Sequence, residues 1–360
     1  MSASEKPSFV FTICQIGAEP ALKKELALNH PELKFAYSRP GFITFKSEKT
    51  LEPDFDLKSV FARAYGLTLT KMTPKDGSIT EKAAKVFEFI PVEKKTVLHV
   101  WERDQHVPGD EPKGFSPGAW SAIAVRALKQ EAAKRPLVKL VINEKAEDGT
   151  DVLDLILIES DEWWLGTHRQ GPHHSPFPGG KPPVVFPHEA PSRAYVKLEE
   201  GLLWSGAQLR KGDVAVEIGS APGGATYALL QKGLKVVGID PGMMDSRVLR
   251  HPEFQHIQRP VAEVHRDDLP HSVQWLLLDM NVAPGVSLFA VDKLATSMKD
   301  SLLGLLLTVK LNQWKFADQI PSMLEHIRSM GMIRAKATQL ASNGQEIFIY
   351  AVTRKGSVRP

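Results

Sequence analysis

The sequence contains a single cysteine, Cys14, in 360 residues, so no disulfide can form within the chain. One thiol also excludes a zinc site built from several cysteines. Such sparing use of cysteine is typical of proteins that work in a reducing compartment, and we therefore expect a cytoplasmic protein.

Long hydrophobic runs are also absent. A membrane span needs about 18 uninterrupted apolar residues, and the longest candidate, residues 301–309, fits a buried strand and the turn before it. The N-terminus lacks the basic segment and apolar run of a secretory signal. We expect a soluble protein without a membrane partner.

Basic and acidic residues are nearly balanced in number. The net charge is +3, and the 42% hydrophobic and 24% charged residues are ordinary for a globular protein. A weakly basic balance allows a polyanionic partner without requiring one. The length suits two or three domains, and nothing in the sequence requires an oligomer.

The first half of the chain mixes short strands and helices. We expect an α+β module over residues 1–75 and a second over residues 76–166. The expected strands are 9–16, two within 35–45, 96–102, 138–142, 152–159 and 162–165. The expected helices are 19–28, one near 58–64, and 118–134.

Residues 167–187 are rich in proline, glycine and histidine and predict a linker. After them, helices and apolar strands alternate, which predicts an α/β domain over residues 188–360 with a doubly wound, mostly parallel sheet. The expected strands are 214–218, 235–239, 275–278, 305–309, 333–339 and 346–352. The expected helices are 192–203, 225–232, 291–301 and 318–329.

A glycine-rich turn, residues 219–224, follows the first of these strands directly. A dinucleotide fingerprint needs glycine where Ala221 stands, and Pro222 removes a backbone amide that pyrophosphate would use. No Gly-Lys-Ser/Thr ending is present, which excludes a P-loop. Asp240 ends the next strand, where an acidic residue binds a ribose diol. An adenosyl ligand without phosphates fits, S-adenosylmethionine above all; the alternative is a tight turn without a ligand.

Three stretches carry a family resemblance. "DVAVEIGSAPGGATYALL" (residues 213–230) resembles motif I of the FtsJ/RrmJ-like RNA 2′-O-ribose methyltransferases, and "APSRAYVKLEEGL" (190–202) resembles a helix of the same family. The run "SPFPGGKPPVVFPHEAPSRAYVKLEE" (175–200) is more similar to the RlmM-type branch, which methylates a cytidine ribose in 23S rRNA. The resemblance is close over residues 170–350 and looser over 1–165.

The resemblance implies a Rossmann-like methyltransferase domain that uses S-adenosylmethionine. It also implies a ferredoxin-like module over residues 1–75, a THUMP-like RNA-binding module over 76–166, and 23S rRNA or its precursor as the partner. Two alternatives stay open: an enzyme of the same fold acting on tRNA or another rRNA site, and a non-catalytic RNA-binding or ribosome-assembly protein that keeps affinity for the cofactor.

The family's catalytic tetrad has matching positions at Lys197, Asp279, Lys310 and Glu346. The resemblance implies Lys310 as the general base that takes the proton of the ribose hydroxyl. Asp279 and Glu346 would position it, and Lys197 would steer the hydroxyl or tune the charge. No step needs a metal. For each residue taken alone, the simpler interpretation is a solvated side chain at a strand end or on a helix.

The resemblance also places the cofactor. The expected contacts are Ser192, Glu217, Gly219, Ala221, Pro222, Gly223, Gly224, Asp240 and Asp279. Ser192 would contact the methionine part, although a serine there is also a natural helix N-cap. Two positions depart from the family: Glu217 replaces an aspartate, and Pro260 stands where an aspartate contacts the adenine. Backbone groups or Glu263 would then recognise the adenine.

Some side chains allow two interpretations. His168, His173, His174 and His188 lack the spacing and carboxylate partners of a metal site, which favours a flexible polar linker. The pair Trp163 and Trp164 either stacks on unpaired bases or is buried in a strand. A helix face with Arg126, Lys129, Lys134 and Arg135 either contacts phosphates or is solvated.

Overall fold

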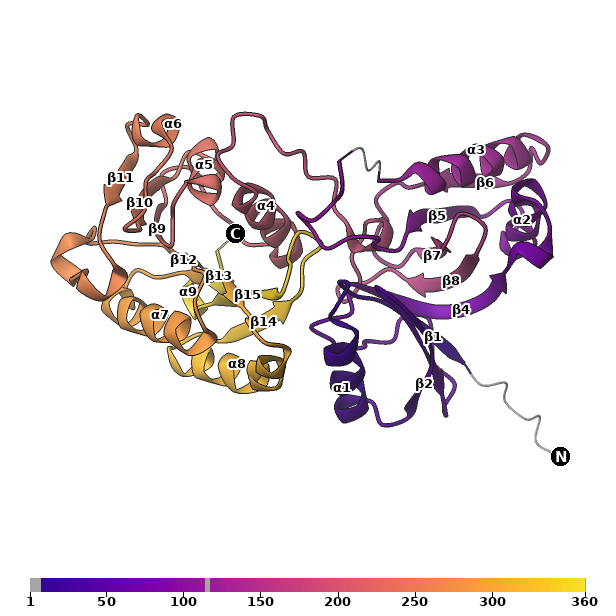
Figure 1. The fold of residues 1–360 in the computed structure, drawn as a ribbon, viewed down its shortest axis with the longest axis horizontal. Coiled ribbons are helices and arrows are strands. Elements are labelled where there is room, and N and C mark those ends of the chain that lie inside the picture. The colour runs from indigo at the N-terminus through magenta and orange to yellow at the C-terminus, as the bar shows by residue number, and fades with distance from the viewer. Residues whose placement is uncertain (1–7, 114–116, 360) are drawn as a thin grey trace. The chain divides into compact units, whose positions relative to one another are not determined.

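The computed structural model describes residues 8–113 and 117–359, and the chain divides into two compact units, Met1–Pro183 and Val184–Pro360 (Figure 1). Among the described residues, no helix is both long and apolar enough to span a bilayer.

The N-terminal unit is built on one eight-stranded sheet with the order β2-β3-β1-β4-β8-β7-β5-β6. Its strands are β1 (Phe9–Ile13), β2 (Leu33–Arg39), β3 (Phe42–Ser47), β4 (Ala64–Met72), β5 (Lys95–Glu102), β6 (Lys139–Ile142), β7 (Asp151–Leu157) and β8 (Trp163–Arg169). Its α-helices are α1 (Glu19–Asn29), α2 (Ile79–Val86) and α3 (Ala119–Ala133).

Strand β4 joins the two halves of this sheet. It pairs with β1 on one side and with β8 on the other, both antiparallel. The strands of the modules predicted for residues 1–75 and 76–166 therefore share one hydrogen-bonded sheet, and the division between those modules stays a prediction.

The predicted helix near residues 58–64 was wrong. The segment is irregular, and Lys58 has a φ of 47°. The carboxylate of Glu25 in α1 accepts hydrogen bonds from the backbone amide of Val60, at 2.8 Å, and from the hydroxyl of Ser59. A carboxylate from a distant helix thus accepts the hydrogen bonds of polar groups that would otherwise have been bonded within a local helix.

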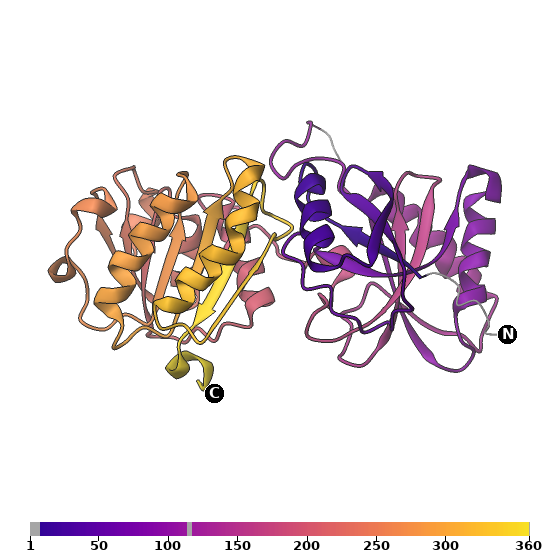
Figure 2. The same cartoon turned by 90° about the horizontal axis from the view of Figure 1, so that it is seen from below.

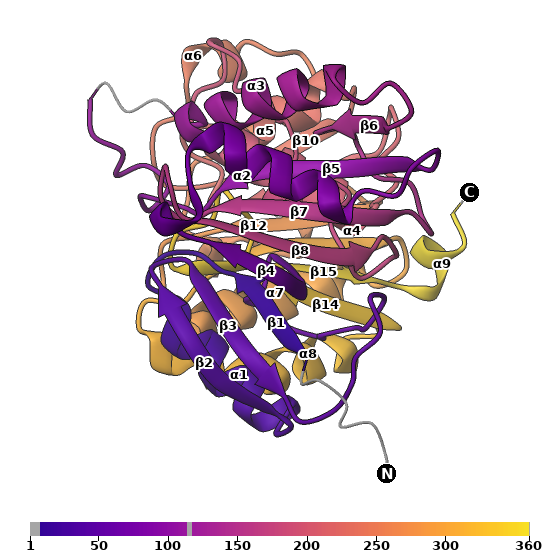
Figure 3. The same ribbon diagram turned by 90° about the vertical axis from the view of Figure 1, so that its right-hand side faces the viewer.

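Helices α2 and α3 cover one face of β5, β7 and β8 (Figure 3). The alternation of apolar residues along these strands sends one set of side chains towards the helices and the other to the opposite face. Trp163 packs in the core under the helices and Trp164 in the core on the other face, and they are 0% and 8% exposed. The buried-aromatic interpretation of this pair was right.

Of the histidines predicted for the linker, one lies in a strand of the sheet and others contact neighbouring side chains. His168 lies in β8, its Nδ1 2.6 Å from Oδ2 of the buried Asp154, and the ring of His174 stacks on it with centroids 4.7 Å apart. His173 Nδ1 lies 3.3 Å from Oδ2 of Asp56. The flexible-linker interpretation was wrong for His168 and His174, because a buried carboxylate and ring packing hold them; His173 is half exposed.

The part of the predicted linker around residues 179–181 is also held against the N-terminal unit. The carboxylate of Asp104 accepts from Arg63 at 2.9 Å and from Lys181 at 2.5 Å, and Arg63 donates to the carbonyl of Gly179 at 3.0 Å. Gly179, with φ of 59°, lies on the indole of Trp101, where a Cβ would come within 3.0 Å of ring atoms. Its first part therefore belongs to the N-terminal unit.

The C-terminal unit is built on a seven-stranded sheet with the order β11-β10-β9-β12-β13-β15-β14. Its strands are β9 (Val214–Ile218), β10 (Lys235–Ile239), β11 (Phe254–Ile257), β12 (Trp275–Asp279), β13 (Gly304–Lys310), β14 (Arg334–Thr338) and β15 (Glu346–Val352). Its α-helices are α4 (Ala194–Ser205), α5 (Gly224–Gln231), α6 (Ser246–Leu249), α7 (Pro284–Met298), α8 (Ile320–Ser329) and α9 (Arg354–Ser357).

This unit confirms the predicted α/β class with a mostly parallel sheet. Only β15 is antiparallel to its neighbours, between β13 and β14. Helices α4 and α5 lie on one face of the sheet, and α7 and α8 lie on the other (Figures 1 and 2). Short elements escaped prediction (α6, β11 and α9), and α7 begins seven residues before the predicted helix start at residue 291.

Gly201 fixes how closely α4 approaches the sheet. It is buried in the middle of the helix, and a Cβ there would fall on the ring of Phe348 in β15, 2.6 Å from Cε2. Because that ring is 2% exposed, it has little room to move, and α4 carries the site described below.

We expect Gly201→Ala to destabilise the C-terminal unit by about 1–2 kcal/mol. Overpacking costs about 1–3 kcal/mol, whereas the gain in helix propensity is at most about 1 kcal/mol. Urea denaturation would measure the change, with the exposed Leu203→Ala on the same helix as a control expected to stay within about 0.5 kcal/mol. A Gly201→Ala protein more stable than the wild type would contradict the close packing.

Candidate active site

Four charged side chains meet at one end of the C-terminal sheet. Asp279 is the last residue of β12, and Lys310 is the last residue of the neighbouring β13. Because β15 runs antiparallel, its first residue, Glu346, pairs directly with Lys310. Lys197 reaches the same point from the first turns of α4. The structure thus brings the four predicted tetrad positions together.

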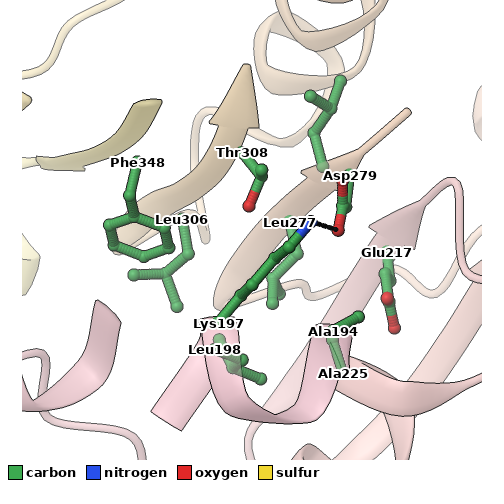
Figure 4. Close-up of a pocket in the computed structure, with 11 residues that line it drawn as sticks. Ala194, Lys197, Leu198, Glu217, Ala225, Leu277, Asp279, Leu306, Thr308 and Phe348 are labelled. Carbon is green, nitrogen blue, oxygen red and sulfur yellow. Dashed lines mark ion pairs between the residues drawn. The ribbon is translucent and has the colours of Figure 1, made fainter. Parts of the chain in front are cut away.

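Each lysine of this cluster contacts both carboxylates. Nζ of Lys197 lies 2.7 Å from Oε1 of Glu346 and 3.6 Å from Oδ2 of Asp279, the ion pair drawn in Figure 4. Nζ of Lys310 lies 3.4 Å from Oδ1 of Asp279 and contacts Oε2 of Glu346 directly. Positive and negative charges therefore alternate around a closed ring.

Burial differs around the ring. The side chain of Glu346 is 4% exposed, whereas those of Lys197, Asp279 and Lys310 are 17–20% exposed. Burial alone would lower the pKa of Lys310, but the carboxylates of Asp279 and Glu346 outweigh it and raise that pKa above its ordinary value. Burial likewise opposes ionisation of Glu346, and the two lysines outweigh it, so its pKa is lowered.

Residues that the sequence did not single out support Glu346. Nδ2 of the fully buried Asn343 donates to Oε1 of Glu346 at 3.1 Å, and its Oδ1 accepts from the amide of Leu340 at 2.9 Å. Glu200 of α4 accepts from the amide and hydroxyl of Ser342, at 2.8 and 2.6 Å. The only local signal for this turn is an Asn-Gly pair just before the strand.

The glycine turn lies against the end of β12. Gly219 has φ of +80°, and a Cβ there would fall on the backbone carbonyl of Asp279. Gly223 has φ of +113°, and a Cβ would come within 2.9 Å of Val248. A Cβ on Gly224 would fall on Ser192. The three glycines are needed for the close approach of the turn to its neighbours, and the peptide between Ala221 and Pro222 is cis.

Asp240 is held at this turn by backbone amides. One carboxylate oxygen accepts from the amide of Ala221 at 3.1 Å, and the other accepts from the amide of Gly242 at 2.6 Å. Each carboxylate oxygen has a second acceptor site, so Asp240 can still bind a ribose diol. An acidic residue fixed beside a glycine turn fits an adenosyl group.

Glu217 lies beneath the turn and is 2% exposed. It accepts from the hydroxyl of Thr226 at 2.5 Å. Burial, together with Asp279 and Asp240, raises the pKa of Glu217 to about 8 against the lowering effect of that hydrogen bond. A cavity of about 20 Å³ separates it from Lys197 and has room for roughly one water (Figure 4).

The remaining predicted positions are spread around the turn. Ser192 is not the N-cap of α4, because that position is Arg193 and no side-chain cap is formed. Pro260 precedes the short 3-10 helix Val261–Glu263, Glu263 is its last residue, and both are exposed. His188 is exposed as well. Over residues 8–113 and 117–359, no group of three His, Cys, Asp or Glu side chains has an arrangement that could hold a metal ion.

Comparisons with known proteins relate this domain to a family of methyltransferases. Residues 190–350 match the family described as FtsJ-like methyltransferase. The protein named Ribosomal RNA large subunit methyltransferase M from Laribacter hongkongensis is 25% identical over 337 residues, which is 89% of this chain and 88% of that protein. Its namesake from Sodalis glossinidius is 30% identical over 190 residues, 50% of this chain and 51% of that protein.

Among solved structures, TrmN from Thermus thermophilus aligns over 96% of this chain and 99% of its own length, at 13% identity and a TM-score of 0.35. That likeness is too weak to support a conclusion.

Residues 190–350 are an FtsJ-like methyltransferase domain. The methyl donor is therefore S-adenosylmethionine, as the sequence predicted, and the glycine turn with Asp240 fits its adenosyl part.

Proposed function

We propose that this protein transfers a methyl group from S-adenosylmethionine to the 2′-hydroxyl of a ribose in RNA, most specifically of a cytidine in 23S rRNA. The observation that carries the proposal is the ring of Lys197, Asp279, Lys310 and Glu346 at the strand ends, next to the glycine turn. The relatives named Ribosomal RNA large subunit methyltransferase M support the substrate class.

The proton of the ribose hydroxyl is the chemical problem that the ring addresses. In the ring, two lysines face two carboxylates, a balance that favours a protonated Lys310. S-adenosylmethionine supplies the methyl group and, through its sulfonium, one further positive charge. A cofactor bound with this charge near Asp279 would lower the cost at which Lys310 loses its proton. Neutral Lys310 then accepts the proton of the hydroxyl.

The other members of the ring position Lys310. Glu346, fixed by Asn343, and Asp279 hold the Nζ of Lys310 from two sides. Lys197 neutralises part of the negative charge of the two carboxylates and is placed to orient the ribose hydroxyl. In the cofactor site, Asp240 binds the ribose, the turn of residues 219–224 lies along the adenosyl group, and Ser192 contacts the methionine part.

The N-terminal unit is proposed to hold the RNA. The proposal keeps the predicted ferredoxin-like module over residues 1–75 and THUMP-like module over 76–166, and it places the enzyme in the cytoplasm. Trp163 and Trp164 take no part, since they are buried. On the helix face considered for phosphate contact, Lys134 and Arg135 both pair with Glu131, at 2.5 and 2.6 Å. Arg126 and Lys129 on the same helix are exposed, so that part of the face stays available for phosphate contact.

The product tests this function. We expect the purified protein, given S-adenosylmethionine and an unmodified 23S rRNA transcript, to produce 2′-O-methylcytidine at one position, detected by mass spectrometry of the digested RNA. An unmodified tRNA pool serves as the control substrate. Methylation of the tRNA alone would favour the alternative substrate, and a methyl group on a base would overturn the reaction assignment.

A further inference from the structure

A basic groove lies at the outer edge of the methyltransferase domain. It runs along β14 and takes in the C-terminal end of α4 and the short helix α9, with a volume of about 520 Å³. Four cationic side chains line it, namely Arg328, Arg334, Lys336 and Arg359. No acidic residue is among those described as lining it.

The charges of this groove are only partly compensated. Arg359 is neutralised by Asp213, to which it donates at 2.6 and 2.8 Å. Arg328 donates one hydrogen bond to the carbonyl of Ala335 at 3.1 Å and keeps its other donors. Arg334 has no ion-pair partner among residues 8–113 and 117–359. Three of the four cations therefore remain without a carboxylate.

Lys336 lines the groove next to an aromatic side chain. Its Nζ lies 4.2 Å from the ring centroid of Trp204, and it donates to the carbonyl of Trp204 at 3.3 Å. Arg334 and Lys336, two residues apart on one strand, project from the same face of the sheet. Burial over the rings and the charge of Arg334 lower the pKa of Lys336. An anion bound between Arg334 and Lys336 would offset the repulsion between them, which is the smaller of the two causes.

The groove is separate from the catalytic ring but close to it along one strand. Lys336 pairs with Tyr350, and Tyr350 also lines the groove. Glu346 of the ring lies four residues earlier on the same strand, which corresponds to about 13 Å. Helix α4 packs on Phe348 between these two positions, so an RNA strand that reaches both the ring and the groove must pass around α4.

We propose that this groove binds the phosphate backbone of the RNA substrate on one side of the target nucleotide, through Arg334, Lys336 and Arg328. The inference rests on the proposed function, which supplies RNA as the polyanion. Guanidinium groups donate in a fork that matches phosphate oxygens. The contacts address the backbone only, so they fix the position of the RNA and carry no sequence preference.

The double variant Arg334→Gln/Lys336→Gln tests the groove. Each lost phosphate contact removes about 0.7 from the slope of log affinity against log salt for a single strand. We expect Kd for an unmodified 23S rRNA transcript to rise roughly 10- to 30-fold near 0.1 M salt and the slope to fall by about 1.4. KM for RNA should rise in step, with kcat at saturating RNA and the Kd of S-adenosylmethionine unchanged.

A matched control removes the same charge elsewhere. Arg250 and Lys299 are exposed on the same domain and lie outside the groove, so Arg250→Gln/Lys299→Gln should change Kd less than about threefold. Equal losses in both double variants would overturn the proposal, because a general charge effect would explain them. An unchanged salt slope in the groove variant would overturn it as well. Polyglutamate serves as a probe for an acidic protein partner. If the groove variant loses binding of polyglutamate but still binds RNA like the wild type, the groove binds such a partner and the proposal is overturned.

The two proposals fail separately. RNA affinity and salt slope are measured without turnover, so they test the groove even if no 2′-O-methyl product forms. If the product forms and the groove variant binds RNA like the wild type, the reaction stands and the groove assignment falls. A melting temperature equal to that of the wild type shows that the groove variant is folded.

Discussion

Replacing Lys310 by alanine is expected to reduce methyl transfer to the ribose by about 100- to 10,000-fold. The loss would appear in kcat, because Lys310 contacts the ring of charges and not the glycine turn. The Kd of S-adenosylmethionine, measured by calorimetry, should stay within about threefold, since only a distant charge effect of less than about 1 kcal/mol is removed. This is the largest effect that the site predicts.

Lys310→Arg is the sharper control. Arginine can keep the contacts with Asp279 and Glu346 but does not lose its proton at accessible pH. An inactive but folded Lys310→Arg protein would show that proton transfer is needed, beyond the ion pairs. Activity of either variant within tenfold of the wild type would exclude Lys310 as the base.

The pH dependence of the wild type carries the same information. Because Asp279 and Glu346 raise the pKa of Lys310, its neutral form is a small fraction at neutral pH and grows tenfold per pH unit. We expect kcat/KM to rise with a slope near one between about pH 7 and 9. A flat profile over that range would argue against a lysine base.

The second large effect is expected for Gly219→Ala. The residue has φ of +80°, and its Cβ would fall on the carbonyl of Asp279, with the carbonyl carbon 2.9 Å away. A backbone carbonyl has no rotamer to adopt, so the end of β12 must move and take the carboxylate of Asp279 with it. A displacement of about 1 Å at a catalytic group costs on the order of 100-fold. We expect that loss in kcat/KM and a Kd of S-adenosylmethionine at least about tenfold higher.

Gly206→Ala separates backbone strain from steric overlap. Gly206 has a similar φ of +68°, but nothing lies within 4 Å of its Cβ position. Both variants carry the strain of a left-handed alanine, about 1–2 kcal/mol, and only Gly219→Ala should lose cofactor affinity. Equal affinities in the two variants would show that the turn does not depend on contact with Asp279.

The meeting of the four candidate side chains could be predicted because most of them end or begin regular elements; their roles stay a prediction. The carboxyl ends of parallel strands meet at one edge, so Asp279 and Lys310 had to lie close together once β12 and β13 were neighbours. The apolar runs before them marked those strands without ambiguity. Glu346 joins them only because β15 is antiparallel to β13, a reversal that neither the residue pattern nor the resemblance had predicted.

Other features depend on contacts between distant segments, which local pattern does not report. Glu25 replaces the hydrogen bonds of a helix near residue 60, and Asn343 supports Glu346 from within an irregular turn. Proline and glycine in residues 175–183 correctly indicated irregular backbone. They gave no sign that Arg63 and Asp104, over 70 residues upstream, hold that backbone in place.

The position of β15 has a consequence for synthesis of the chain. It follows β14 in the sequence, yet it lies inside the sheet, between β13 and β14. Until its residues leave the ribosome, β14 has no partner, β13 is an open edge, and the ring lacks Glu346. A polypeptide cut short before residue 346 therefore lacks a complete site and exposes a hydrophobic strand edge prone to aggregation. Polypeptides truncated before residue 346 should have no methyltransferase activity and should be recognised by chaperones and proteases.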